Sequence, residues 1–150
     1  MRMKISYLIA SFIILALVAY IGSIFTSSGT NSEWYQSVKP AITPPNWIFP
    51  IAWGIIFFLI ALSLYFVLIS RKKLALIIYG INFFLNILWS IFYFQLKNPF
   101  LAFIEILILF ISIIIMIIAG SRINKKAGYL LIPYLLWVIF AAILNYLSIK

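Results

Sequence analysis

Asparagine and aromatic side chains recur at helical spacing between residues 74 and 96 of this sequence. At intervals of four, three and four residues stand Asn82, Asn86, Trp89 and Tyr93. This spacing places all four side chains on one face of a helix. Two amides and two aromatic rings on one face favour a pocket, whereas each Asn alone is at least as typical of a hydrogen-bonding contact between membrane helices. Both interpretations stay open for Asn82 and Asn86.

Two other apolar segments carry a similar stripe. Their side chains repeat at every fourth position, as Phe49, Trp53 and Phe57 and as Trp137, Ala141 and Asn145. Trp53 and Trp137 fall inside their segments, where an indole N–H needs a polar partner or a cavity. Three such faces predict the wall of a site for a flat, apolar ligand with a few polar groups. An interfacial aromatic belt is an equally good interpretation for residues near segment ends, namely Trp34, Tyr35, Trp47 and Tyr129.

The sequence lacks most side chains of acid–base and metal chemistry. It contains no Cys and no His, and its two acidic residues are Glu33 and Glu105. Disulfides, a Ser-His-Asp relay, paired carboxylates and the usual metal sites are therefore excluded, and we predict neither a metal nor a resident cofactor. Glu105 is the lone acid inside an apolar segment, which makes it a functional candidate by default. Its position near the segment end favours a structural role.

The elements that must position these side chains are five apolar segments. They span about residues 5–25, 47–69, 74–96, 100–119 and 129–149. Each has roughly the 20 residues that an α-helix needs to cross a bilayer, whereas barrel strands would alternate in polarity. With 67% hydrophobic residues, the chain has too few polar side chains to cover a water-soluble protein. We predict an all-α integral membrane protein, a five-transmembrane-helix bundle forming one domain over residues 1–150. The first segment is expected to be an uncleaved helix rather than a signal peptide.

Basic residues are distributed unequally between the two faces of this bundle. The N-terminal face carries eight, which are Arg2, Lys4, Arg71, Lys72, Lys73, Arg122, Lys125 and Lys126. The opposite face carries three, Lys39, Lys97 and Lys150. Because cytoplasmic loops are enriched in Lys and Arg, we expect the N-terminus to be cytoplasmic and the C-terminus outside. The same clusters account for the net charge of +9 without a nucleic-acid partner.

One connection, residues 26–46, is long enough to do more than join two helices. It ends in KPAITPPNW, where Pro40, Pro44 and Pro45 fix the backbone φ angle. Thr43 is expected to cap the second helix, with Pro44 as its first residue. A long, stiff loop at the end of a bundle is typical of a lid over a binding site.

Four stretches of the sequence together resemble one family of membrane proteins. They are WYQSVKPAITPP, FPIAWGIIFFLIALSLY, NFFLNILWSIFYF and LLIPYLLWVIFAAILN. In order and spacing they are similar to the signature segments of the tryptophan-rich sensory protein and translocator protein family (TspO/MBR), also called the peripheral-type benzodiazepine receptor family. The resemblance covers about Trp34 to Asn145. It implies a five-helix bundle, usually a homodimer, with a pocket at one end under the loop between the first two helices.

The resemblance also implies ligands and site residues. Family members bind porphyrins such as protoporphyrin IX, haem, sterols in some cases, and synthetic benzodiazepine-type and isoquinoline compounds. On this sequence the matching pocket positions are Tyr35, Pro44, Trp53, Asn82, Asn86, Trp89, Trp137, Ala141 and Asn145. Members that bind haem are often credited with His ligands, which this chain lacks, so nitrogen ligation of the iron is not expected.

Three classes of function stay open. The expected one is a ligand-binding protein in the lipid bilayer that transports or senses tetrapyrroles or sterol-like lipids. The second is light- and oxygen-dependent porphyrin breakdown, for which Trp53 and Trp137 would be the photochemical residues. The third is a structural membrane subunit without a ligand. Since the chain has no His, Cys or Asp and only one carboxylate inside an apolar segment, we expect no acid–base or metal-dependent turnover in the dark.

Overall fold

The computed structural model describes residues 3–150 of the chain, and eight helical elements lie in this range. They are α1 (Ile5–Thr30), α2 (Glu33–Val38), α3 (Ile48–Ser70), α4 (Lys73–Ser90), the π-helical segment η1 (Ile91–Gln95), α5 (Pro99–Ile123), α6 (Lys125–Tyr129) and α7 (Ile132–Leu147). Within this range five units are long and apolar enough to cross a membrane: α1, α3, α4 with η1, α5, and α6 with α7. The prediction of an all-α membrane protein with five transmembrane helices is confirmed.

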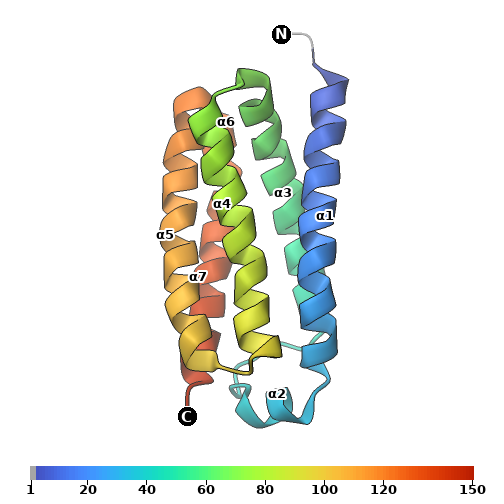
Figure 1. Ribbon diagram of the computed structural model, residues 1–150, viewed down its shortest axis with the longest axis vertical. Helices are drawn as coiled ribbons and strands as arrows, with labels where there is room; N and C mark the ends of the chain where they lie inside the picture. Colours follow the sequence, from blue (N-terminus) through green and yellow to red (C-terminus); the bar gives the residue numbers. More distant parts are fainter. Residues whose placement is uncertain (1–2) are drawn as a thin grey trace.

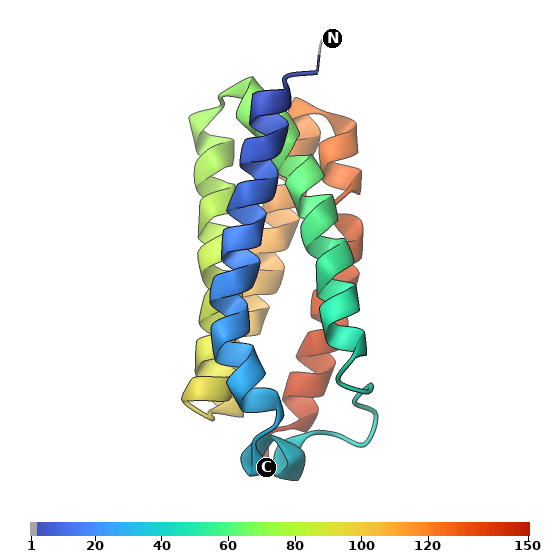
Figure 2. The ribbon, with the colours of Figure 1, turned by 90° about the vertical axis from the view of Figure 1, so that its right-hand side faces the viewer.

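The five long units stand side by side along the long axis of the molecule (Figure 1). The start of α1, the turn between α3 and α4 and the junction of α5 with α6 lie at one end, called here the N-terminal end. α2, the turn between α4 and α5, and the C-terminus lie at the other, the C-terminal end (Figures 1 and 2). The largest contacts join α4 to α5, α1 to α3, and α5 to α7.

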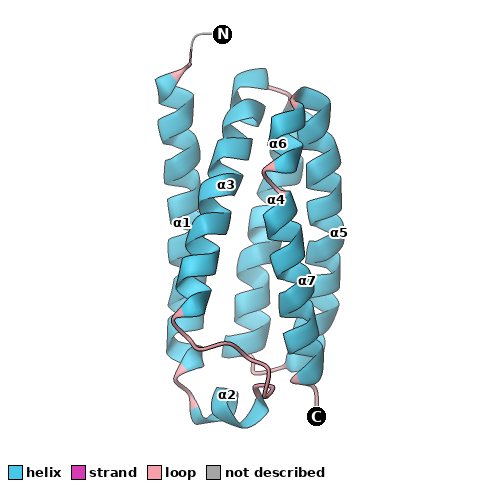
Figure 3. Ribbon diagram, turned by 180° about the vertical axis from the view of Figure 1, so that it is seen from behind, coloured by secondary structure: helices cyan, strands magenta, loops and turns pink. Residues whose placement is uncertain are grey.

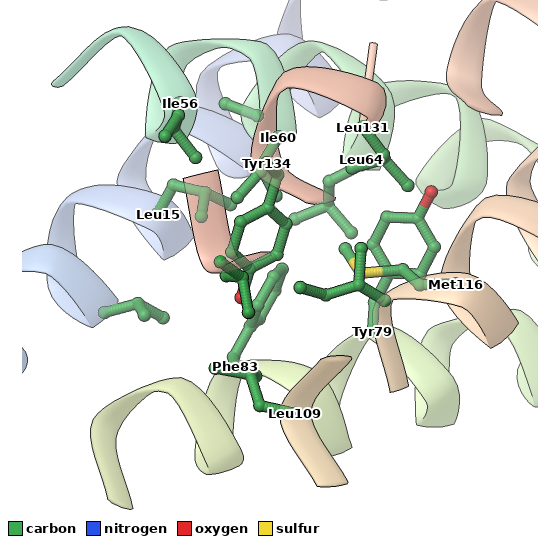
Figure 4. Close-up of a cluster of buried hydrophobic side chains, with 14 of the residues drawn as sticks. Leu15, Ile56, Ile60, Leu64, Tyr79, Phe83, Leu109, Met116, Leu131 and Tyr134 are labelled. Carbon is green, nitrogen blue, oxygen red and sulfur yellow. The ribbon is translucent and has the colours of Figure 1, made fainter. Parts of the chain in front are cut away.

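The helices are apolar on nearly every side because their outer faces meet lipid. Large side chains such as Ile9, Ile77 and Ile108 are more than half exposed, which suits contact with acyl chains. The interior is filled by aliphatic side chains and a few large rings. Figure 4 shows Tyr79 and Tyr134 among aliphatic side chains of α1, α3 and α5.

Several helix ends differ from the predicted boundaries. α1 continues past Phe25 to Thr30, and part of the expected loop forms α2. The fifth segment is interrupted, because α6 ends at Tyr129 and α7 begins only at Ile132. Pro133 has no N–H to donate to the carbonyl of Tyr129, and its ring crowds the preceding turn. The chain therefore breaks its helix between α6 and α7.

The prediction that Thr43 caps the second transmembrane helix is wrong. α3 begins at Ile48, with Trp47 in the capping position. The N–H of Ile48 donates to the carbonyl of Pro45 at 3.0 Å. A residue that precedes proline is driven away from the helical region, and Pro44 precedes Pro45. Pro44 is thus a poor first residue of a helix, and the stretch from Thr43 belongs to the connection.

Two glycines let helical elements approach closely. A Cβ at Gly29, near the end of α1, would lie 2.6 Å from Cγ of Phe94 in η1. A Cβ at Gly128 in α6 would overlap the hydroxyl of Ser121 and lie 3.1 Å from the carbonyl oxygen of Ile117 in α5. The first glycine lets α1 pack on η1, and the second lets α6 lie against α5.

We expect Gly29→Ala and Gly128→Ala to lower the temperature of unfolding in detergent micelles. Overpacking a close contact typically costs ~1–3 kcal/mol, which exceeds the gain of up to ~1 kcal/mol from replacing a helical Gly by Ala. Gly80→Ala is the matched control, because no atom lies within 4 Å of a Cβ there. It should leave the unfolding temperature unchanged or raise it. Equal behaviour of all three variants would contradict the packing argument.

Candidate functional site

A cavity of about 530 Å³ opens among the helices at the C-terminal end of the bundle. Its walls come from α1, α3, α4, α5 and α7, together with η1. The connection between α1 and α3 crosses this end of the molecule (Figure 3). Within the connection, the residues that line the cavity are Asn31, Tyr35, Pro40, Thr43 and Asn46. The connection therefore lies over the cavity, in the position expected of a lid.

Most pocket residues expected from the sequence line this cavity. They are Tyr35, Trp53, Asn86, Trp89, Trp137, Ala141 and Asn145. Pro44 and Asn82 are not among the lining residues. Asn82 lies one turn before Asn86 on α4 and is completely buried between helices. In the connection, Thr43 lines the cavity instead of Pro44. The structure thus does not bring Pro44 or Asn82 to the cavity wall.

Aromatic rings of α3 and α7 form one wall of the cavity. Trp53 meets Trp137 edge-on, with ring centroids 6.4 Å apart, and stacks on Phe57 at 5.3 Å. Phe49 meets Trp137 edge-on at 5.9 Å. The spacing of four residues on α3 therefore sets three rings along one face. Trp47 lies outside this wall, with 66% of its surface exposed.

Hydrogen bonds from α4 join this helix to α5 and α7 deep in the bundle. Asn82 donates through Nδ2 to Ser112 Oγ at 2.9 Å and accepts through Oδ1 from the hydroxyl of Tyr134 at 3.1 Å. Asn86 donates through Nδ2 to the same Tyr134 hydroxyl at 3.0 Å. Asn82 is thus a contact between helices with both amide groups paired. Asn86 also lines the cavity, and no hydrogen bond within residues 3–150 uses its carbonyl oxygen.

The same helix face continues these bonds toward the C-terminal end. Trp89 donates through Nε1 to Asn145 Oδ1 at 2.9 Å, and Asn145 Nδ2 donates to the Pro99 carbonyl at 2.8 Å. The hydroxyls of Tyr93 and Ser148 lie 2.8 Å apart. We call Asn82, Asn86 and Trp89 of α4 and Tyr93 of η1, with their partners, the α4 polar ladder. It pairs the groups that would otherwise be unsatisfied in hydrocarbon.

Helix α2 is fastened over the cavity mouth. Ser32 caps it by accepting the N–H of Tyr35 at 3.2 Å. Tyr35 is buried, with its ring 6.4 Å from Tyr93 and 5.6 Å from Phe94 of η1. Burial, with a smaller contribution from Tyr93, raises the pKa of the Tyr35 hydroxyl to about 12. Tyr35 is therefore a neutral hydrogen-bond donor at the cavity wall at physiological pH.

The π-helical segment η1 presents two neighbouring rings to α2. Its hydrogen bonds reach one residue further than in an α-helix, as from the Leu96 N–H to the Ile91 carbonyl at 2.9 Å. Tyr93 and Phe94 are consecutive in sequence, yet both are buried at 4% and 7% exposure. The altered winding lets both rings meet Tyr35. Nothing in the amino-acid pattern predicts this segment.

Two buried polar atoms of cavity-lining residues have no partner within the described residues. They are Nε1 of Trp137 and Oγ1 of Thr43, and both atoms are buried. Both residues line the cavity, Trp137 from α7 and Thr43 from the connection. An unpaired buried donor is costly in an apolar setting. These atoms are therefore suited to hydrogen-bond a ligand's polar groups.

Glu105 lies on α5 close to the cavity but does not line it. It is only 3% exposed, and neither carboxylate oxygen has a hydrogen-bond partner within residues 3–150. The following residue, Ile106, is the one that reaches the cavity. Glu105 therefore does not form part of the cavity wall, and no hydrogen bond within residues 3–150 shows a structural role for its carboxyl group.

Helix α1 supplies one side of the cavity, which the sequence analysis did not anticipate. Its lining residues are all small or hydroxyl-bearing: Ala19, Gly22, Ser23, Thr26, Ser27 and Thr30. They recur at intervals of three and four, so a search for small residues at helical spacing would have found this face. Thr26 also donates to Ser90 Oγ of α4 at 3.3 Å. Small side chains here leave room for the cavity.

Comparison with known proteins gives a consistent match along nearly the whole chain. Residues 10–149 match the model of the TspO/MBR family. The chain is 38% identical to the tryptophan-rich protein TspO of Archaeoglobus fulgidus, over 96% of this chain and 95% of that protein. It is 30% identical to the tryptophan-rich sensory protein of Cereibacter sphaeroides, over 79% and 76% of the two chains. It is also 30% identical to the translocator protein of Ovis aries, over 79% and 74%.

We expect Asn82→Leu to lower the unfolding temperature more than Asn86→Leu. The first change removes two hydrogen bonds and leaves the Tyr134 hydroxyl proton without its acceptor, while the second removes one bond at the cavity wall. Interhelical bonds in membranes are worth ~0.6–2 kcal/mol each, so the difference should be measurable by thermal unfolding in micelles. A larger loss in Asn86→Leu would show that the ladder does not depend on Asn82.

Proposed function

This chain belongs to the TspO/MBR family, and we propose that it binds a flat, apolar ligand in the cavity beneath the α1–α3 connection. The favoured ligand class is a tetrapyrrole such as protoporphyrin IX or haem, and sterol-like lipids are the second class. In this proposal the protein is a transporter or stress sensor, in keeping with the names of its relatives, a sensory protein and a translocator protein.

The observation that carries the proposal is the convergence of aromatic side chains on one cavity. Trp53 from α3, Trp89 from α4 and Trp137 from α7 are far apart in sequence but line the same space. A volume of about 530 Å³ lies within the ~300–1,000 Å³ range of small-molecule sites. Flat aromatic walls favour a planar ligand, because ring stacking adds ~0.5–1.5 kcal/mol per contact beyond the buried area.

Sparse polar groups around the cavity fit the edge of such a ligand. Trp137 Nε1 and Thr43 Oγ1 are unpaired, the Tyr35 hydroxyl is a neutral donor, and the Asn86 carbonyl is an unused acceptor. Tyr35 and Thr43 belong to the α1–α3 connection, so a ligand that bonds them would hold the connection over the cavity. Movement of this connection would then admit and release the ligand.

Orientation and assembly are further parts of the proposal. Lys4, Arg71–Lys73, Arg122, Lys125 and Lys126 lie at the N-terminal end of the bundle, whereas Arg2 lies outside the described residues. Because basic residues mark the cytoplasmic side, we propose a cytoplasmic N-terminus and an outer C-terminus, with the cavity mouth facing outward. A homodimer is proposed from family membership.

A titration with protoporphyrin IX tests the binding proposal. We expect saturable quenching of tryptophan fluorescence in the purified protein. Trp53→Phe and Trp137→Phe should each weaken binding by up to about tenfold, because Phe keeps a ring but loses part of the stacking area and the indole N–H, and a whole stacked contact contributes ~0.5–1.5 kcal/mol. Trp47→Phe is the matched control, since Trp47 is exposed and lies outside the cavity. Quenching that never saturates, or an equal loss in the control, would favour a structural subunit without a ligand.

A second candidate function, light-dependent porphyrin breakdown, has one observation in its favour. Trp53 and Trp137 lie with ring centroids 6.4 Å apart on the same cavity wall, so a bound porphyrin could sensitise chemistry beside both. Such conversion would need light and oxygen, because the chain offers no acid–base pair or thiol.

Parallel dark and illuminated incubations with protoporphyrin IX separate these functions, using wild type and Glu105→Gln. We expect no conversion in the dark for either protein, and under light the same conversion for both if breakdown occurs at all. The absorbance spectrum of the porphyrin reports its consumption. Dark turnover that Glu105→Gln abolishes would replace the binding proposal with a carboxylate enzyme.

A further inference from the structure

A second concave site lies at the N-terminal end of the bundle, opposite the cavity. It is an open groove of about 400 Å³ between the last turns of α5 and the short helix α6. Its lining residues are Ile117, Ile118, Ser121, Arg122, Lys125 and Tyr129. None of them takes part in the site described above. We call this feature the α5–α6 groove.

The groove combines an apolar side with a cationic rim. Ile118 is 48% exposed, and with Ile117 it offers hydrocarbon on the part of the groove that lies further into the bundle. Arg122 and Lys125 are exposed at the helix junction, and Tyr129 is 66% exposed. At a membrane interface this order, from hydrocarbon through hydroxyl to cation, follows the order of a lipid from acyl chain to headgroup.

No carboxylate of this chain is placed to neutralise the rim. Glu33 lies in α2 at the opposite end of the bundle, as does the chain's C-terminus. Glu105 is buried in the first half of α5. Arg122 and Lys125 therefore present two positive charges without an internal counter-ion, and they are complementary to an anion.

The shape of the groove is fixed by close packing of α6 on α5 and by hydrogen bonds of the helix junction. Gly128 lets α6 lie against Ser121 of α5. The carbonyl of Ala127 accepts a hydrogen bond from Ser63 Oγ of α3 at 2.7 Å, and Ser63 also bonds the hydroxyl of Tyr79 at 2.7 Å. Asn124 caps α6 by accepting from the N–H of Lys126 at 2.9 Å. The two cationic residues therefore stand on a fixed junction.

We propose that the α5–α6 groove binds an anionic glycerophospholipid. Its phosphate lies between Arg122 and Lys125, where charge-assisted hydrogen bonds are strongest. The hydroxyls of Ser121 and Tyr129 donate to the remaining oxygens, and an acyl chain follows Ile117 and Ile118. A zwitterionic lipid fits less well, because its ammonium group would lie beside Arg122 and Lys125 and no carboxylate is near to pair with it.

The test uses protein purified in detergent and stripped of lipid, titrated with phosphatidylglycerol or phosphatidylcholine of the same acyl chains. Native mass spectrometry counts the bound lipid. The groove variant is Arg122→Gln with Lys125→Gln. The matched control is Lys72→Gln with Lys73→Gln, which removes the same charge from the same end of the bundle outside the groove. Unfolding temperatures confirm that each variant is folded.

We expect wild type to bind phosphatidylglycerol more tightly than phosphatidylcholine. A basic side chain near an anionic lipid typically contributes about fivefold, so the groove variant should lose about tenfold or more in affinity and the control less than about twofold. Ile118→Trp, which fills the groove and keeps both charges, should also weaken binding. Excess inorganic phosphate should not displace the lipid.

Three results would overturn the proposal. Equal losses in the groove variant and the control would indicate general attraction to a basic surface. Unchanged binding in Ile118→Trp would show that the acyl chain does not lie in the groove. Displacement by inorganic phosphate would make the site a free-anion site. Because the groove lies at the opposite end from the cavity, none of these results depends on whether porphyrin binds.

Discussion

No water is available inside a bilayer to satisfy a buried amide or hydroxyl, and this constraint determines how α4, α5 and α7 fit together. The α4 polar ladder meets it by pairing each polar side chain on one face of α4 with a group on a neighbouring helix. Asn145 is the clearest case, because its carbonyl accepts from Trp89 while its amide donates to the Pro99 carbonyl. Such directional bonds fix how α4, α5 and α7 are aligned along their axes, although the surfaces of these helices are otherwise almost uniformly apolar. The hydrophobic effect cannot do this alone, since lipid is as apolar as the helix surfaces.

The candidate site lies where buried polar groups are no longer all hydrogen-bonded. Within the ladder, Asn82 is completely buried, and both its amide nitrogen and its carbonyl oxygen are hydrogen-bonded. At the cavity wall Asn86 keeps a carbonyl unused, and Trp137 and Thr43 each hold a buried atom without a partner. The same helices thus provide a closed interior whose polar groups are paired and an open cavity beside which buried polar atoms stay unpaired. Small residues along α1 and the packing of α2 on η1 give that space its volume and its cover.

The two ends of the bundle are chemically different. The C-terminal end carries the cavity, the stiff connection and few charges, whereas the N-terminal end carries most of the basic residues around tight helix junctions. Glycines serve both ends, Gly29 by admitting Phe94 and Gly128 by admitting Ser121. This division places the proposed ligand site at one end and the proposed lipid site at the other. The two ends can therefore be altered independently by mutation.

The sequence by itself determined the fold class, the number of spans and the aromatic part of the cavity wall. Long apolar runs permit only helices in a bilayer, and a period of 3.6 residues assigns Trp53, Asn86 and Trp137 to inward faces without further information. Tertiary structure alone decided which inward residues reach the cavity. Asn82 and Asn86 are the same residue type on the same face of α4. Asn82 is buried against Ser112 of α5, whereas Asn86 lines the cavity, because the surroundings of each turn depend on the neighbouring helices. The π-helical turn likewise brings Tyr93 and Phe94 together beside Tyr35 of α2, and periodicity within a single helix does not encode this contact.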